Sequence, residues 1–362
     1  MEKKNFENVE NENAEIIQSE IQEEKTERRS HKKKLLLLLM LLLVTGVLLG
    51  TSTYSWFTAN KKVAVNDITV NVAAQNGIQI SVDGTSWKSI VQTSDLLGAA
   101  TKYPGAVNQI PSETSSIAPV STVGNIDSNG RMEMYLGDVL TNETTGEYIL
   151  KSTKEEEVAG SVGSFIAFDL FFKVDENTPV WITPDSGVTT SGVDTGIKNA
   201  TRMGFVILGN TTAGDTLGNI QGLNAGASAT KYIWEPNYDV HTAAAVNNAY
   251  DTYGLSTTQT GGSLLPYSGV KAEFDAVDNV SLKVPSTQTH ATQYSTYFGA
   301  VTPDYTTVAA FDQNLPIWTF TKGITQVRVY MWVEGQDVDC ENSASGGNIT
   351  YSLSITSENA TI

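Results

Sequence analysis

The chain is poor in the residues that most often carry catalysis. It has one cysteine, Cys340, and three histidines, His31, His241 and His290, among 362 residues. A lone cysteine excludes a disulfide within the chain and leaves either a simple thiol or a bridge between two copies. The sequence contains no His-Glu-x-x-His, Gly-x-Ser-x-Gly, phosphate-loop or dinucleotide-binding motif. The common motifs therefore give no support to an enzyme.

Charge is also scarce and is mostly of one sign. Charged residues make up 17% of the chain, against roughly 25% in soluble proteins. Residues 1–34 hold 9 acidic and 8 basic groups, so almost all of the net charge of −17 lies beyond them. A negative field repels nucleic-acid phosphates, which argues against nucleic acid as a partner. Hydrophobic residues reach 40%, enough for a sizeable core.

One long apolar run stands near the N-terminus. Residues 35–57, from Leu35 to Phe57, follow a basic cluster over 28–34 and are long enough to cross a hydrocarbon core of roughly 30 Å. Basic residues favour the cytoplasmic side. The sequence therefore predicts a cytoplasmic polar tail over 1–34, a transmembrane or signal helix over 35–57, and an exported part over 58–362.

The apolar run has two interpretations, a cleaved signal or a permanent anchor. Small residues precede Trp56 at Thr53 and Ser55, as a signal peptidase requires, so cleavage would fall between Ser55 and Trp56. The long tail and the full-length span instead favour an anchor. The protein is expected at the cell surface, membrane-anchored or secreted, with its N-terminus cytoplasmic before any cleavage.

The exported part shows the period-two pattern of strands. Ile68, Val70 and Val72 alternate with polar residues, and a second strand over 78–82 leads into the turn residues Asp83-Gly84. Residues 165–174 are apolar on both faces, which predicts a strand in the centre of a sheet. Near the C-terminus, strands over 327–333 and 349–355 flank an acidic loop and predict a hairpin.

This arrangement predicts an all-β fold. Strands at both ends with loop-rich insertions between them favour an antiparallel β-sandwich or jelly roll. Residues 209–312 are rich in turns and are expected to form a sub-domain within the exported domain.

Two groups of residues are candidate binding sites. Glu334, Asp337, Asp339 and Glu341 offer carboxylates at short spacing, as calcium prefers, but they lack the EF-hand spacing, which favours the alternative of a solvated hairpin loop. Tyr232, Trp234 and Tyr238 are a candidate stacking surface for sugar rings, with burial in the core as the alternative. His241 follows Asp239 as a candidate base or an ordinary loop histidine.

Residues 50–57 read Gly-Thr-Ser-Thr-Tyr-Ser-Trp-Phe and lie between the apolar run and the strand predicted over 68–72. This arrangement resembles the TasA/camelysin family of exported bacterial surface and biofilm-matrix proteins, with a SipW-type signal peptide. The resemblance implies cleavage before Trp56 by a dedicated signal peptidase, a jelly-roll fold, and fibres formed by donation of an N-terminal strand. The metal ligands of camelysin have no counterpart in this sequence.

Three functions follow as hypotheses. The first is a non-enzymatic structural protein of the cell surface or extracellular matrix, which self-assembles through a donor strand made of Trp56, Phe57, Ile68, Val70 and Val72. An apolar, β-prone arm of this kind seeks a sheet edge in another subunit. The second is a membrane-anchored extracellular module that recognises a glycan or a protein. The third is an exported hydrolase that uses scattered carboxylates.

Overall fold

A computed structural model describes most of the chain beyond residue 62. The described residues are 63–73, 77–99, 103, 105–106, 108–110, 116–160, 163–238, 240–253, 256–260, 267–285, 287–306, 316–341, 344 and 346–357. All of them belong to one compact unit, Thr53–Ile362. In these ranges no helix is both long enough and apolar enough to span a membrane. The predicted span over 35–57 and the Ser55–Trp56 bond lie outside the described residues.

The fold is mostly β, as predicted, and its strands form several sheets. The largest sheet of the described residues has seven strands. Five of them follow one another in the order β17 (Trp318–Phe320), β9 (Thr178–Ile182), β19 (Asn348–Thr356), β1 (Val63–Ala73) and β3 (Ile90–Gln92). The other two are β10 (Gly187–Thr190), which pairs with β19, and β4 (Ser116–Ile117), which pairs with β1.

A second sheet has six strands, two of which are buried along almost their whole length. Its order is β16 (Tyr305–Thr306), β12 (Thr230–Glu235), β11 (Thr201–Thr211), β18 (Gly323–Val333), β8 (Ile166–Val174) and β2 (Gln79–Ser81). The two buried strands are β8 and β18. All of its neighbouring strands are antiparallel except β12 and β16, which are parallel.

Two smaller sheets and several short helices complete the described chain. A four-stranded sheet runs in the order β14 (Val280–Ser281), β7 (Tyr148–Glu155), β6 (Met134–Thr141) and β5 (Val120–Ser121), and β13 (Tyr267–Val270) pairs with β15 (Phe298–Val301). The α-helices are α2 (Thr93–Ala99), α3 (Leu217–Gln221), α4 (Ala243–Tyr253) and α5 (His290–Gln293). The 3-10 helices are η1 (Ile197–Ala200), η2 (Gly226–Ser228) and η3 (Ala276–Asp278).

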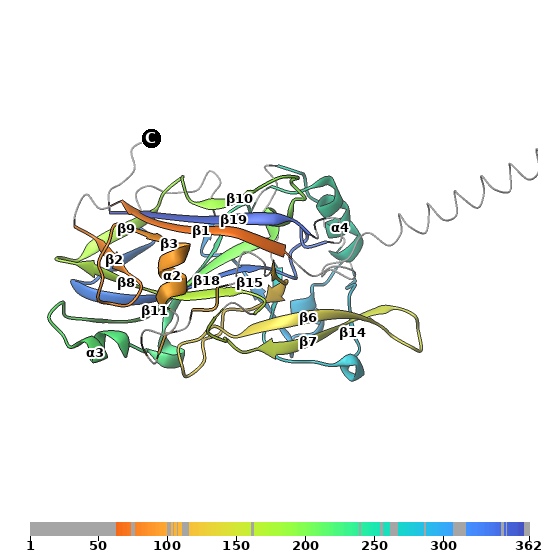
Figure 1. The fold of residues 1–362 in the computed structure, drawn as a ribbon. Coiled ribbons are helices and arrows are strands. Elements are labelled where there is room, and N and C mark those ends of the chain that lie inside the picture. Colours follow the sequence, from red (N-terminus) through yellow and green to blue (C-terminus); the bar gives the residue numbers. More distant parts are fainter. Residues whose placement is uncertain are drawn as a thin grey trace, which may run out of the picture. The chain divides into compact units, whose positions relative to one another are not determined.

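The six-stranded sheet is the middle of three layers (Figure 1). One side of β8 carries Phe168 and Phe172, which pack in a core shared with the seven-stranded sheet. The other side carries Ala167, which packs in a second core with Met134 of the four-stranded sheet. A strand covered on both faces must be apolar on both faces. The burial of both faces that the sequence predicts for residues 165–174 is therefore confirmed, although β8 is the fifth of the six strands and lies next to the edge strand β2 instead of at the centre of the sheet.

The strand that follows the predicted export segment is paired within its own chain. β1 runs parallel to the last strand, β19, from Ala64 beside Asn348 to Ala73 beside Thr356. On its other side it meets only the short strands β3 and β4 in the described residues. The predicted donor residues Ile68, Val70 and Val72 all lie in this strand. A donor role for them would require β1 to leave its own sheet.

The predicted C-terminal hairpin is wrong. β18 belongs to the six-stranded sheet, where β11 and β8 flank it, whereas β19 belongs to the seven-stranded sheet. The chain between them crosses from one layer to the next instead of turning back on itself. Sequence alternation fixes which face of each strand is buried, but it does not determine which strand lies beside it.

Residues 209–312 are distributed over several parts of the unit. β12 joins the six-stranded sheet, while β13, β14, β15 and α5 pack with the four-stranded sheet around Val270, Phe274 and Phe298.

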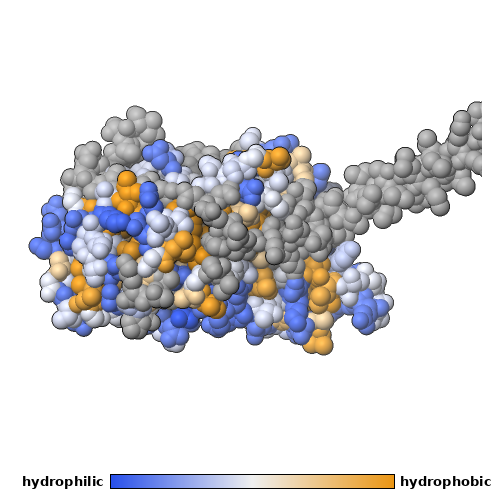
Figure 2. Space-filling view, in the orientation of Figure 1, coloured by the Kyte–Doolittle hydropathy of each residue, from blue (hydrophilic) through white to orange (hydrophobic). Residues whose placement is uncertain are grey.

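On the face shown in Figure 2, hydrophobic side chains emerge in the area of β3 and α2. Ile90 and Leu97 of these two elements are about half exposed, at 50% and 47%.

The buried side chains of β8 should contribute strongly to the free energy of unfolding. Phe168 is fully buried, so Phe168→Ala should lower the free energy of unfolding by about 3–5 kcal/mol through lost transfer energy and a cavity. Val277 is 91% exposed, and Val277→Ala should change it by less than about 0.5 kcal/mol. Chemical denaturation of the full chain measures both values. A similar loss in the two variants would contradict the layered core.

Candidate functional site

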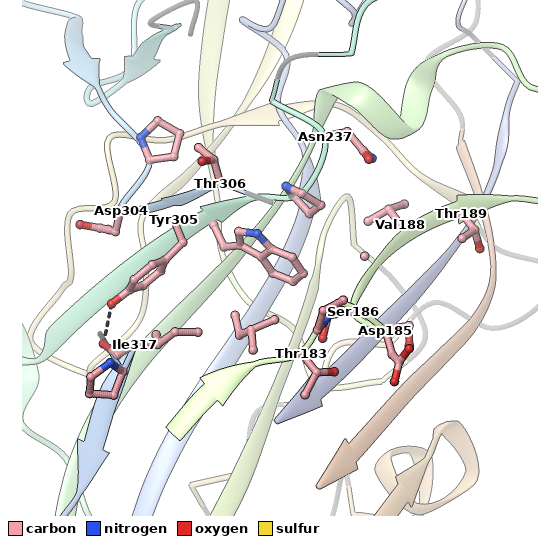
Figure 3. Close-up of a pocket in the computed structure, with 18 residues that line it drawn as sticks. Thr183, Asp185, Ser186, Val188, Thr189, Asn237, Asp304, Tyr305, Thr306 and Ile317 are labelled. Atoms are coloured by element: carbon pink, nitrogen blue, oxygen red, sulfur yellow. Dashed lines mark hydrogen bonds between the residues drawn. The ribbon is translucent and has the colours of Figure 1, made fainter. Parts of the chain in front are cut away.

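The main concave site is a pocket of about 640 Å³ between two sheets. We call it the aromatic pocket. Four segments line it: residues 182–189, which include β10, residues 234–237 at the end of β12, residues 303–306, which include β16, and residues 316–317. Figure 3 shows Asp304, Tyr305 and Thr306 on one side, with Thr183, Asp185 and Ser186 on the other. The site is thus assembled from segments that are distant in the sequence.

The floor of the aromatic pocket is apolar and rigid. Ile182, Val188, Trp234 and Ile317 line it and are at most 6% exposed. Tyr305 is only half-buried, and its hydroxyl group donates a hydrogen bond to the carbonyl of Ile317 (Figure 3). Four prolines stiffen the walls, because each fixes its own backbone φ angle; they are Pro184, Pro236, Pro303 and Pro316.

The rim of the pocket is polar and carries only negative charge. Asp185 and Asp304 are both exposed, and no lysine, arginine or histidine lines the pocket. Asp304 is held in place because its carboxylate accepts a hydrogen bond from the backbone N–H of Ile233 at 2.8 Å. The hydroxyl of Thr183 is buried and has no hydrogen-bond partner. A ligand of this pocket must therefore be neutral or cationic and must offer apolar groups to the floor.

Two sheet edges border the aromatic pocket. β10 pairs only with β19, and β16 pairs only with β12, among the strands that the structure describes. Each strand therefore presents one side of its backbone to no described strand. An edge strand offers a row of N–H and C=O groups to which an extended chain can bind.

The aromatic residues predicted to bind sugars do not form one surface. Trp234 is 2% exposed and belongs to the pocket floor. Tyr232 lies outside the pocket lining, where its ring stacks on Trp318 with centroids 5.8 Å apart. Tyr238 follows in the turn after β12 and does not line the pocket either. The half-exposed ring in the pocket is Tyr305, which no sequence pattern singled out.

The predicted acidic loop is buried, so its interpretation as a solvated hairpin loop is wrong. Glu334, Asp337, Asp339 and Glu341 are between 0% and 7% exposed. Glu334 accepts hydrogen bonds from the indole N–H of Trp332 and the backbone N–H of Gln336, both at 3.1 Å. Burying charged groups is costly unless each one is paired, and each carboxylate does have partners.

Arg202 supplies the main countercharge. This fully buried side chain forms ion pairs with Asp337 and, at 3.0 Å, with Glu235. It also donates to the carbonyl of Thr201 at 2.9 Å and lies over the ring of Tyr267. Burial alone would lower the pKa of Arg202, but Glu235, Asp337 and other negatively charged neighbours together outweigh burial and raise that pKa. The guanidinium is therefore a fixed positive charge inside the fold.

His241 forms the second buried pair. Its Nδ1 lies 2.6 Å from an oxygen of Asp339, whose other oxygen accepts from the backbone N–H of Thr242 at 3.2 Å. Burial lowers the pKa of His241, but the hydrogen bond to Asp339 and the negative charges of Asp339, Asp337 and Glu235 together outweigh that effect and raise it. The expectation of an ordinary loop histidine is therefore wrong. His241 fastens the acidic loop to the start of α4.

These contacts give the four carboxylates separate partners. Within the described ranges no group of three or more histidine, cysteine, aspartate or glutamate side chains is arranged to hold a metal ion. The calcium hypothesis for the acidic loop gains no support from this arrangement. Cys340 is also fully buried, which leaves no surface for a disulfide between two copies unless the loop opens.

Comparison with known proteins finds no matching family model, no matching curated protein and no matching solved structure. The resemblance to the TasA/camelysin family therefore rests on the residues around the Ser55–Trp56 bond, which lie outside the described ranges together with Phe57.

The buried loop should make stability depend on pH. Burial raises the pKa of Glu334 from 4.5 to about 7, so between these values the folded chain holds a proton that the unfolded chain releases. The free energy of unfolding should therefore fall as the pH rises through this window. Glu334→Gln cannot titrate and should remove a slope of up to about 1.4 kcal/mol per pH unit.

Chemical denaturation of the full chain at several values between pH 5 and pH 8 measures this slope. Glu176→Gln removes an exposed carboxyl group and is the matched control, which should keep the slope of the unaltered chain. Equal slopes for the Glu334→Gln variant and the unaltered chain would contradict the account.

Proposed function

We propose that this protein is a non-enzymatic structural or adhesive protein of the cell surface or extracellular matrix, in which the aromatic pocket receives an extended segment of another copy. One observation carries the proposal: an apolar pocket of about 640 Å³ lies between the edges of β10 and β16. Backbone groups at an edge bind an extended chain, and a pocket beside the edge selects its side chains.

The composition of the pocket favours an apolar, uncharged or cationic segment. Its floor is formed by Ile182, Val188, Trp234 and Ile317, and its rim carries Asp185 and Asp304. The segment that best matches it in this sequence is residues 53–62, which contain Trp56 and Phe57, followed by two lysines and no acidic residue. Large aromatic side chains gain most from burial in such a floor.

This assignment restricts the predicted donor to the residues that precede β1. Ile68, Val70 and Val72 are already paired with β19 in their own chain, so the proposal places the donor in the residues before β1. A donor segment that is continuous with a strand of its own subunit links one copy to the next. Such a head-to-tail contact generates a filament when the rotation between copies does not close a ring.

The proposal also covers the export of the protein and the class of its β fold. The apolar run from Leu35 to Phe57 after basic residues supports placement of the described unit outside the cytoplasm, with signal peptidase as a partner if the chain is cut before Trp56. The packed β-sheets support an elaborated β-sandwich of the jelly-roll class.

A second candidate function is recognition of a glycan in the same pocket, which would make the protein a surface binding module. The half-exposed ring of Tyr305 favours it, because sugar rings stack on aromatic faces, and Asp185 and Asp304 can accept hydrogen bonds from sugar hydroxyls.

The hydrolase hypothesis has less support. Burial raises the pKa of four carboxylates to between about 6 and 8, and none of them lines this pocket or the other described pockets; they are Glu157, Glu235, Glu334 and Asp339.

A charge on the edge of β10 tests the proposal. Thr189 is exposed at this edge, and Thr189→Lys should obstruct strand addition, as edge lysines do in natural sheets. Assembly of the full chain, followed by analytical ultracentrifugation and electron microscopy, should fall about tenfold or more, which corresponds to a loss of 1.4 kcal/mol. Thr141→Lys adds the same charge at an exposed position on β6 and should assemble normally.

Equal assembly of both lysine variants and the unaltered chain would contradict strand addition at β10. A chain that stays monomeric but binds polysaccharide, and loses this binding in Tyr305→Ala, would instead establish the second candidate function.

A further inference from the structure

A second, smaller pocket differs from the aromatic pocket in charge. It measures about 260 Å³ and we call it the arginine pocket. Two guanidinium groups and four amide side chains line it, and no carboxylate does; these are Arg131, Arg328, Asn129, Gln221, Asn224 and Gln326. Beyond residue 34 the sequence has only three arginines, Arg131, Arg202 and Arg328. Two of them meet at this pocket, in a chain whose net charge is −17.

The fold holds Arg328 rigidly at the base of the arginine pocket. Arg328 on β18 lies beside Asp169 on β8, and its Nε and Nη2 atoms donate to the two carboxylate oxygens at 2.7 Å and 3.0 Å. Longer contacts reach the carbonyls of Gly130 and Gly105 at 3.4 Å and 3.5 Å. A guanidinium has five N–H donors, so one Nη1 donor remains after these contacts.

Arg131 is the more available of the two arginines. Its side chain is 34% exposed, and its Nε lies 3.7 Å from a carboxylate oxygen of Glu157, too far for a hydrogen bond. No other described residue accepts a hydrogen bond from this guanidinium. The turn before it is fixed, because the carboxylate of Asp127 accepts from the backbone N–H groups of Asn129 and Arg131 at 2.8 Å and 2.9 Å. Arg131 is thus a positioned donor without an acceptor.

Gln326 supplies a hydrogen-bond acceptor without a donor, whereas Arg131 supplies donors without an acceptor. It is 1% exposed, and its Nε2 donates to Asp169 at 3.3 Å. Its Oε1 is buried and has no hydrogen-bond partner. A buried acceptor left without a donor costs roughly 1–3 kcal/mol. A ligand hydroxyl in the arginine pocket would satisfy this atom.

We propose that the arginine pocket binds a sugar acid, that is, a single hydroxylated ring that carries one carboxylate. The planar carboxylate matches the fork of donors on Arg131, and such charge-assisted pairs are stronger than neutral ones. Ring hydroxyls donate to the orphaned oxygen of Gln326 and exchange hydrogen bonds with the side chains of Asn129 and Asn224. The volume of about 260 Å³ suits one ring.

The sugar acid distinguishes this site from a general anion site. A sulfate ion carries no proton at neutral pH, so it would engage the arginines but leave the acceptor on Gln326 without a donor hydroxyl. A neutral sugar would satisfy Gln326 but leave Arg131 without its carboxylate. A sugar acid carries a carboxylate for Arg131 and ring hydroxyls for Gln326, and the site is independent of the aromatic pocket.

Isothermal titration calorimetry on the full chain in detergent micelles at neutral pH tests the proposal, with glucuronate, glucose and inorganic sulfate as the probes. Glucuronate should bind about tenfold or more tightly than glucose or sulfate, because a hydrogen bond to a charged group contributes at least that factor. Arg131→Gln should weaken glucuronate binding about tenfold or more. Lys283→Gln removes one exposed positive charge away from the pocket and should leave the affinity within a factor of about two.

A second variant, Gln326→Leu, removes the orphaned acceptor and should weaken the binding of glucuronate but not that of sulfate. An unchanged far-ultraviolet circular dichroism spectrum establishes that this variant folds. Glucuronate binding that survives Arg131→Gln, or glucose or sulfate binding as tightly as glucuronate, would overturn the proposal. Absence of any glucuronate binding by the unaltered chain would do the same.

Discussion

The buried guanidinium of Arg202 constrains the fold more than any other single group, because a charge inside a protein must be paired. It stands at the start of β11, between Glu235 at the end of β12 and Asp337 in the loop after β18. The chain leaving β18 is therefore held against the middle layer before it crosses to the outer one. Glu334 continues this anchoring through its backbone N–H, which donates to the carbonyl of Ala200 at 2.7 Å.

The end of β12 connects the charge cluster around Arg202 to the aromatic pocket. Along β12, Trp234 faces the pocket floor and the next residue, Glu235, faces Arg202. Pro236 and Asn237 then form the pocket wall, and Asn237 donates to the carbonyl of Lys198 at 3.2 Å. The pocket is thus built on paired strands, while β10 and β16 beside it each pair on one side only among the described strands. In strand addition, backbone groups at such an edge give affinity and a neighbouring pocket gives specificity.

Local patterns in the sequence predicted the strands but not their partners. The apolar run of β8 identified a strand with both faces buried, and the alternation of 327–333 identified β18. The pairing of β1 with β19 and the two arginine sites depend on contacts between distant residues. Asp337 and Asp339 seemed exposed because their partners, Arg202 and His241, lie 135 and 98 residues away. The aromatic pocket was missed for the same reason, since four separate segments form it.

The central claim is that the pocket between β10 and β16 receives residues 53–62 of another copy. Disulfide trapping tests it most directly. One full-length chain would carry Phe57→Cys and another Thr189→Cys, and the native Cys340 is buried in both. Mixing the two under mild oxidation should yield a disulfide-linked heterodimer, whereas Thr141→Cys in place of Thr189→Cys should yield none. No heterodimer with Thr189→Cys, or equal yields from both positions, would contradict the account.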